Sequence, residues 1–277
     1  MGTEIAASQV VNSDVSVFTS TDGLNHLAGT NSTGQLVIFS QTTSKDANGN
    51  YTWSFANIAT RDLIPNGQTM PAWVGDITTY VTSWNGMNVA GLDGSGKIQV
   101  VWWAPGLSAW RADDLSSQTG APAITGTLTS YLTPWGGINL AGTDAGGKLN
   151  VTWWVPGANW VTNNLTDMFA GPALVTTSLS SYVTPWGGLN VAGLDSNGKL
   201  NVYWWAPGMT DWVVTNLSDI TVGALTPSGR MTGVASPSGT INLVGKAASG
   251  EVLRFFWNPG DGGTWSFLNV TTAASFF

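Results

Sequence analysis

The sequence predicts an all-β protein, specifically a five-bladed β-propeller whose blades are four-stranded antiparallel sheets. Three observations support this fold class. A motif recurs along the chain with a period near 51 residues, each copy contains four short β-rich segments, and no segment shows a helical hydrophobic period. The 277 residues are 43% hydrophobic and include 35 glycines, which suits a large core interrupted by many tight turns.

The repeat is clearest in the middle of the chain. The segments Tyr80–Trp84, Tyr131–Trp135 and Tyr182–Trp186 are similar and lie 51 residues apart. They are followed by MNVAGLDGSGKIQVVWW, INLAGTDAGGKLNVTWW and LNVAGLDSNGKLNVYWW, and two weaker copies, NHLAGTNSTGQLVIFSQ and INLVGKAASGEVLRFFW, flank these three. One glycine is common to all five copies, at Gly29, Gly91, Gly142, Gly193 and Gly245.

Each copy contains four segments with β character, which in the third copy are 127–133, 138–143, 148–155 and 160–165. Short turns rich in Gly, Pro and Asp connect them, so we expect an antiparallel meander. Radial repetition of such a unit is typical of a propeller. The copies occupy the whole chain, and we predict a single domain, 1–277, with approximate blades 12–66, 76–118, 127–169, 178–221 and 228–277.

Positions shared by all five copies are expected to serve the architecture. A tryptophan opens the fourth segment of each copy, and we expect it to pack between blades; these residues are Trp53, Trp110, Trp160, Trp212 and Trp265. The shared glycine lies within a strand, where it is expected to admit a close neighbour. Residues 44–51 form an insertion in the last turn of the first copy.

Charge and composition exclude several classes of partner. Nine Lys and Arg against sixteen Asp and Glu give a net charge of −7, which disfavours nucleic acid and anionic lipid. Without cysteine there is no disulfide framework. No apolar run approaches the roughly 20 residues needed to cross a bilayer, so no membrane insertion is expected. Residues 1–10 lack the basic and apolar parts of a leader, so we expect a soluble protein, either cytoplasmic or secreted after processing.

Candidate ligand-binding residues are those special to the three middle copies. A tryptophan lies in the first turn, an asparagine begins the second strand, and a Trp-Trp pair ends the third. A sugar ring stacks its C–H face on an indole and hydrogen-bonds to amides through its hydroxyls. We predict saccharide sites between neighbouring blades at this Trp-rich face, formed by Trp84, Trp135, Trp186, Asn88, Asn139, Asn190, Trp103, Trp154 and Trp205.

The repetition predicts a multivalent protein with three similar sites and saccharides or glycoconjugates as partners. The outer copies carry Asp22 and Ser238 where the turn tryptophan stands, so their sites are expected to be degenerate. A second interpretation is a structural or protein-interaction propeller, in which the tryptophans fill gaps between blades and the asparagines satisfy strand backbones.

A third interpretation is a five-bladed glycoside hydrolase, which needs two carboxylates about 5–9.5 Å apart. Among the acidic residues outside the repeat pattern, Asp76 is the only strong candidate for such a carboxylate. The sole histidine, His26, has no neighbouring Ser–Asp pattern. We therefore predict no enzyme and no catalytic residue. Asp93, Asp144 and Asp195 open glycine-containing turns but supply one carboxylate each, too few for calcium, so neither a metal nor a cofactor is expected.

Copies such as INLAGTDAGGKLNVTWWVPGANW resemble the blades of bacterial propeller lectins of the Photorhabdus type. The likeness rests on the hydrophobic strand, the (T/L)DxxGxL turn, the Trp-Trp strand end and the tryptophan that opens the outer strand. Those lectins are seven-bladed and bind fucosylated or O-methylated sugars. In its five-fold organisation the chain is also similar to the tachylectin type, which binds N-acetylated hexosamines, although the tachylectin motif differs. The resemblance implies carbohydrate binding between blades.

Overall fold

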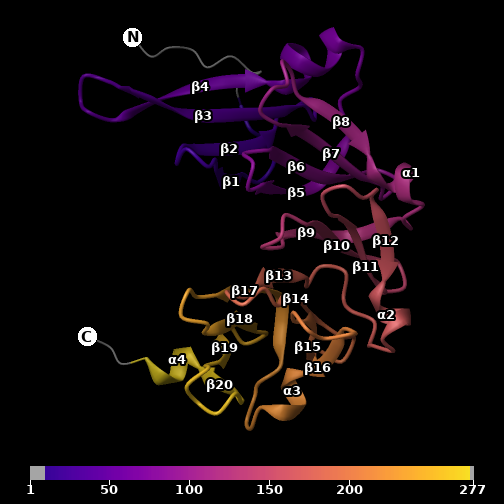
Figure 1. Cartoon of the computed structure of the whole chain (residues 1–277). Helices are drawn as coiled ribbons and strands as arrows, with labels where there is room; N and C mark the ends of the chain where they lie inside the picture. The colour runs from indigo at the N-terminus through magenta and orange to yellow at the C-terminus, as the bar shows by residue number, and fades with distance from the viewer. Residues whose placement is uncertain (1–9, 275–277) are drawn as a thin grey trace. The chain divides into compact units, whose positions relative to one another are not determined.

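The computed structural model describes residues 10–274, and these form five antiparallel sheets of four strands each (Figure 1). Within every sheet the strands lie side by side in chain order, as in a meander. The prediction of an all-β chain with five four-stranded antiparallel units is confirmed. The stretch in which a leader was sought, residues 1–10, lies almost wholly outside the described residues.

The chain divides into two compact units, Met1–Ile124 and Thr125–Phe277. The first unit holds the first and second sheets. The first sheet consists of β1 (Ser16–Thr19), β2 (Asn25–Thr30), β3 (Leu36–Lys45) and β4 (Tyr51–Asn57). Two short helices, η2 (Ala59–Leu63) and η3 (Ile64–Asn66), lead to the second sheet, which consists of β5 (Trp73–Val81), β6 (Met87–Asp93), β7 (Ile98–Trp103) and β8 (Arg111–Asp114).

The second unit holds the remaining sheets. The third sheet consists of β9 (Ile124–Leu132), β10 (Ile138–Asp144), β11 (Leu149–Trp154) and β12 (Val161–Asn164). The fourth consists of β13 (Ser180–Val183), β14 (Leu189–Leu194), β15 (Leu200–Trp205) and β16 (Val213–Asn216). The fifth consists of β17 (Pro227–Ala235), β18 (Ile241–Ala247), β19 (Val252–Trp257) and β20 (Trp265–Asn269).

One helical turn follows the outer strand of each of the last four sheets. These turns are α1 (Leu115–Thr119), α2 (Leu165–Met168), α3 (Leu217–Ile220) and α4 (Val270–Ala273). The preceding Asp or Asn accepts a hydrogen bond from the backbone N–H three residues on, which caps the turn. Sequence analysis did not predict these helices because they are too short to produce a hydrophobic period. None of the helices within residues 10–274 is long and apolar enough to span a bilayer.

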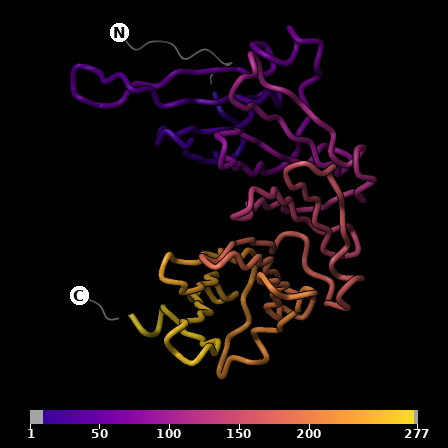
Figure 2. Tube along the Cα trace, in the orientation of Figure 1, coloured from indigo at the N-terminus to yellow at the C-terminus, as the bar shows by residue number. Residues whose placement is uncertain are grey.

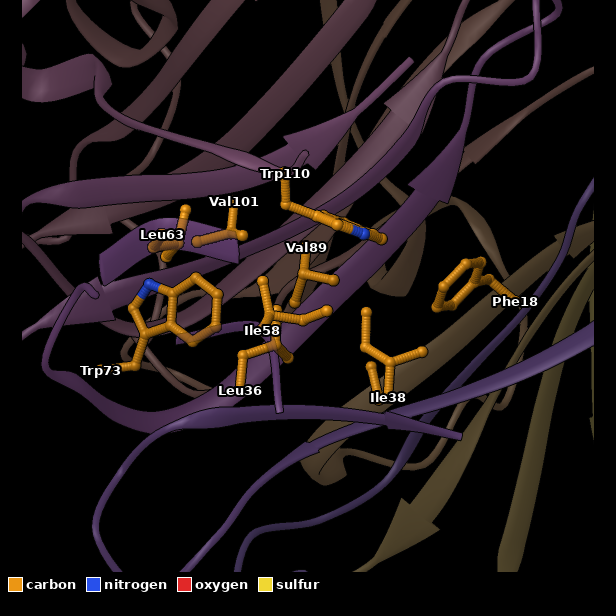
Figure 3. Close-up of a cluster of buried hydrophobic side chains, with 10 residues drawn as sticks. Phe18, Leu36, Ile38, Ile58, Leu63, Trp73, Val89, Val101 and Trp110 are labelled. Carbon is orange, nitrogen blue, oxygen red and sulfur yellow. The ribbon is translucent and has the colours of Figure 1, made fainter. Parts of the chain in front are cut away.

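The core of the first unit lies between its two sheets (Figure 3). Ile38 of the first sheet and Val89 of the second pack together with Trp73 and Trp110. Trp110 is buried, as expected for the tryptophan that opens an outer strand. Its counterpart Trp53 is 46% exposed, so a packing role in every copy was wrong.

The insertion explains the exposure of Trp53. It lengthens β3 and β4 into a hairpin that projects from the first sheet, as Figures 1 and 2 show. Within this hairpin Trp53 pairs with Gln41, a polar residue in place of the tryptophan of other copies. The ring therefore lies beyond the part of the sheet that the second sheet covers.

The shared glycines admit close neighbours, as predicted. A Cβ on Gly91 would lie 2.9 Å from the ring of Trp73, and one on Gly245 would lie 2.2 Å from the sulfur of Met231. Both neighbours come from the inner strand of the same sheet. Glycine also extends two inner strands beyond the predicted blade boundaries, because Gly75 and Gly126, at φ 74° and 77°, let β5 and β9 start earlier.

The tyrosines of the inner strands belong to the core. Tyr80, Tyr131 and Tyr182 are 5–6% exposed, and their hydroxyls have no hydrogen-bond partner among the described residues. Burial raises the pKa of each phenol. Sequence analysis left a core position and a channel-lining position open for these rings, and burial decides for the core.

Candidate functional site

The turn between the first two strands of a sheet sets its tryptophan at the apex. In the third sheet the N–H of Gly136 donates to the Thr133 carbonyl at 3.0 Å, and that of Gly137 donates to the Thr133 hydroxyl at 2.6 Å. Gly136 has φ 85°, which a residue with a side chain rarely adopts. Trp135 is consequently 46% exposed, and Trp186 in the equivalent turn is 45% exposed.

Each of these tryptophans borders a cavity between consecutive sheets. The cavity between the third and fourth sheets has a volume of about 240 Å³ and is lined by Trp135, Asn139, Val151, Trp153, Asn163, Leu165, Met168, Phe169, Leu189, Trp205 and Trp212. The cavity between the fourth and fifth sheets has a volume of about 440 Å³ and is lined by Thr184, Trp186, Gly188, Asn190, Val202, Trp204, Trp205, Ala206, Thr215, Leu217, Ile241, Trp257, Gly263 and Trp265. Because their lining residues occupy matching repeat positions, the two cavities are copies of one site.

Four indoles from two sheets occupy matching positions around each cavity, and Trp205 is a fifth indole at the larger one. One sheet contributes its turn tryptophan and the first member of its Trp-Trp pair, while the next sheet contributes the last tryptophan of its third strand and the one that opens its outer strand. The ring centroids of Trp135 and Trp205 are 5.8 Å apart at an interplanar angle of 75°. Those of Trp186 and Trp257 are 5.5 Å apart at 57°. These edge contacts leave ring faces available to a ligand.

Hydrogen bonds fix the orientation of the inner indoles. The Nε1 of Trp153 donates to Asn163 Oδ1 at 2.6 Å, and that of Trp204 donates to Thr215 Oγ1 at 3.0 Å. The Nε1 of Trp205 donates to the Met209 carbonyl at 2.9 Å. A ligand in either cavity therefore meets rings that are already held in place.

The asparagines supply a polar group without a charge. Asn139 and Asn190 are buried, and the Nδ2 of Asn190 donates to the Gly188 carbonyl at 3.1 Å. Their Oδ1 atoms accept no hydrogen bond from the described residues, so an acceptor is left in each cavity. No charged residue lines either cavity. The arrangement can hold a neutral molecule that has an apolar face and a hydroxyl donor.

The cavities bring together five of the nine residues predicted to bind a sugar, namely Trp135, Asn139, Trp186, Asn190 and Trp205. Trp154 is not among the residues that line either cavity. In the first unit, Trp84 is 41% exposed, Asn88 donates to the Gly86 carbonyl at 3.0 Å, and Trp103 donates to the Leu107 carbonyl at 3.0 Å.

Sequence reasoning missed the tryptophans that complete the cavities, which are Trp153, Trp204, Trp212, Trp257 and Trp265. One signal was available. Asn139 pairs with Trp153 across the strands, so both side chains lie on the same face of the third sheet, whereas Trp154 pairs with Ile138 on the other face. The second tryptophan of a Trp-Trp pair can therefore share a cavity with the asparagine of the preceding sheet, as Trp205 does with Asn139.

The first sheet carries different chemistry at the same positions. The Nδ1 of His26 lies 2.9 Å from Ser40 Oγ, the Nε2 lies 3.0 Å from Ser20 Oγ, and the Ser20 hydroxyl donates to Asp22. Two serines and an aspartate do lie near His26, contrary to the expectation of no neighbouring Ser–Asp pattern, because β2 and β3 pair His26 directly with Ser40. The carboxylate bonds Ser20 and not the imidazole, so the set differs from a Ser–His–Asp triad.

This histidine makes stability depend on pH. Burial lowers the pKa of His26 below its usual 6.5, so the unfolded chain takes up a proton at a higher pH than the folded one. We expect the free energy of unfolding to fall as the pH drops below about 6.5. His26→Asn introduces the residue that all four other sheets carry here, and it is expected to remove most of this decrease. Urea unfolding at pH 7.5 and 5.5 measures it, and an equal decrease in the variant would contradict the assignment.

The aspartates at the second turns act within those turns. Oδ1 of Asp144 accepts the N–H groups of Gly146 and Lys148 at 2.9 and 3.0 Å, and Asp93 and Asp195 make the corresponding bonds. These bonds fit the predicted turn role. Asp76, the acid considered for glycoside hydrolysis, is exposed on β5.

Comparison with known proteins relates this fold to propeller lectins. The lectin BP39L from Burkholderia pseudomallei is 13% identical, with a TM-score of 0.67, and the likeness covers 95% of this chain and 71% of that one. The six-bladed β-propeller lectin of Aleuria aurantia, whose fucose recognition mode has been described, is 15% identical, with a TM-score of 0.57 over 92% of this chain and 76% of that one. AofleA from Arthrobotrys oligospora is 10% identical, with a TM-score of 0.60 over 94% and 72%.

At these identities the likeness concerns the fold alone. It relates the five four-stranded sheets to those of β-propellers. No model of a protein family matches the sequence, and no curated protein matches it.

Proposed function

We propose that this chain is a carbohydrate-binding lectin, a single five-bladed β-propeller with neutral sugars bound between consecutive sheets. The observation that carries the proposal is the recurring cavity, which is lined by at least four indoles, an amide oxygen that accepts no bond from the described residues, and no charged side chain. Indole faces suit the C–H face of a sugar, and the oxygens of Asn139 and Asn190 suit a sugar hydroxyl. The fold of the related lectins supports the same class of ligand.

A deoxy sugar such as fucose is the first ligand to test. The Aleuria aurantia lectin recognises fucose, and an exposed methyl group adds apolar area that the tryptophans of these cavities can cover. The turn tryptophans Trp84, Trp135 and Trp186 define three equivalent positions, so we propose a multivalent protein. Several weak sites gain avidity when they engage one glycan surface.

Calorimetric titration with methyl α-fucoside, methyl galactoside and N-acetylglucosamine tests this function, with tryptophan fluorescence as a second readout. We expect saturable binding of at least one sugar with about three sites per chain. We also expect much tighter retention on a surface densely coated with that sugar than on a sparse one. A flat response to a broad glycan panel, in protein with a cooperative unfolding transition, would reject the lectin in favour of the protein-interaction propeller.

A further inference from the structure

The fifth sheet carries a modified copy of the cavity wall. In the third sheet this wall consists of Val151 and Trp153 on β11 with Asn139 opposite them on β10. Strand pairing puts Arg254, Phe256 and Asn242 at the same positions in the fifth sheet. An arginine thus stands where the third and fourth sheets have valine.

The guanidinium of Arg254 changes this wall from a hydrogen-bond acceptor to a hydrogen-bond donor. The Nε of Arg254 donates to Asn242 Oδ1 at 2.7 Å, which occupies the acceptor that the other asparagines leave free. The guanidinium carbon lies 4.2 Å from the ring centroid of Phe256, so the group is held against that ring by a cation–π contact. The face now presents the Nη donors of a fixed cation instead of an amide oxygen.

No protein carboxylate neutralises this cation among residues 10–274. In each of the second, third and fourth sheets a lysine lies in the turn between the second and third strands. These residues, Lys97, Lys148 and Lys199, each pair with an aspartate at the start of, or within, the adjacent helical turn. The fifth sheet has Glu251 at that turn position. Its strands carry three cations, Arg230 on β17, Lys246 on β18 and Arg254 on β19, and of these Arg254 is the one hydrogen-bonded to the asparagine of the wall. The third and fourth sheets thus have a paired lysine in the turn and no cation on the wall, whereas the fifth sheet lacks that lysine and has on the wall an arginine without a carboxylate partner among the described residues.

We propose that Arg254, Asn242 and Phe256 form a separate site for an anionic sugar, whose carboxylate takes the two free Nη groups. A planar guanidinium with its Nε already satisfied offers a fork that matches a carboxylate. Half-burial of the arginine strengthens the interaction relative to a fully exposed cation. This site differs in ligand class from the neutral cavities and does not use their tryptophans.

Titration with glucuronate, glucuronate methyl ester and glucose tests the proposal without any variant. We expect glucuronate to bind at least tenfold more tightly than the ester or glucose, and the preference to shrink as salt rises from about 0.05 to 0.5 M. Glucose 6-sulfate distinguishes a carboxylate fork from a general anion site, because equal binding of the sulfate would overturn the carboxylate assignment. Absence of glucuronate binding would also overturn it.

Three variants locate the site. Arg254→Gln is expected to lose glucuronate binding at least tenfold, and Arg254→Lys, which keeps the charge and loses the fork, to fall between. Arg230→Gln, an exposed arginine of β17, is the matched control and is expected to have no effect. Unchanged binding in Arg254→Gln would refute the site.

The two proposals fail separately. Trp186→Ala is expected to weaken fucoside binding and leave glucuronate binding intact, and Arg254→Gln is expected to do the reverse. Loss of both ligands in both variants would show one shared site and would overturn the separate one.

Discussion

Trp186→Ala is expected to weaken sugar binding at its cavity by at least tenfold while leaving the protein folded. Trp186 contributes an exposed ring face, and stacking adds about 0.5–1.5 kcal/mol to the free energy gained by covering apolar area. Together these terms exceed the 1.4 kcal/mol that corresponds to a factor of ten. Since the side chain is 45% exposed, its removal costs little core packing.

Calorimetric titration of the single variants Trp135→Ala and Trp186→Ala with the sugar measures this effect as a loss of binding sites. The double variant shows whether the losses at the two cavities add. Trp53→Ala is the matched control, because Trp53 is 46% exposed and lines neither cavity. It removes the same chromophore without touching a proposed site. Equal losses in Trp53→Ala and Trp186→Ala would contradict a binding role for the turn tryptophans. Trp186→Phe is expected to retain part of the affinity.

Gly126→Ala is expected to destabilise the second unit by about 3 kcal/mol. A Cβ at this position would lie 2.1 Å from the carbonyl oxygen of Thr176, and Gly126 has φ 77°. The same oxygen accepts the N–H of Thr127 at 2.8 Å, so it cannot retreat without losing a hydrogen bond. This approach joins the third sheet to the segment that leads into the fourth sheet, and the smaller cavity is lined by residues of those two sheets.

Gly157→Ala separates the two causes of the stability loss expected for Gly126→Ala, which are backbone strain and the contact with Thr176. Gly157 has φ 85° but nothing within 4 Å of its ideal Cβ. Its variant is therefore expected to lose only the free energy of backbone strain, about 1–2 kcal/mol. Urea unfolding of both variants gives the difference. We also expect Gly126→Ala to weaken binding at the cavity between the third and fourth sheets more than at the larger cavity. Equal destabilisation by the two substitutions would show that the contact with Thr176 yields freely.

Much of the fold was predictable because it depends on neighbouring residues. The four strands of the third sheet follow the predicted segments closely, since glycine, proline and aspartate mark each turn. The exposure of Trp135 also followed from its place beside two glycines. The asparagines beside it were predicted as part of the same site, and Asn139 lines the cavity next to Trp135.

The composition of the cavities was not predictable in the same way. Trp205 reaches Trp135 from the next sheet, 70 residues along the chain, and no local pattern encodes that approach. The hydrogen bonds of His26 likewise depend on which residue of β3 lies opposite it. The role given to Trp53 failed because an insertion moved it away from the adjacent sheet.

The sequence by itself determined five copies of a four-stranded antiparallel unit, the turns that expose Trp84, Trp135 and Trp186, and a chain poor in charge. These features depend on backbone conformation and side-chain alternation within a few residues. Only the tertiary structure decided which indoles enclose a common cavity, and that Arg254 lies on the matching wall of the fifth sheet. Those relations arise from strand register and from the packing of one sheet on the next, which join residues that are distant in the chain.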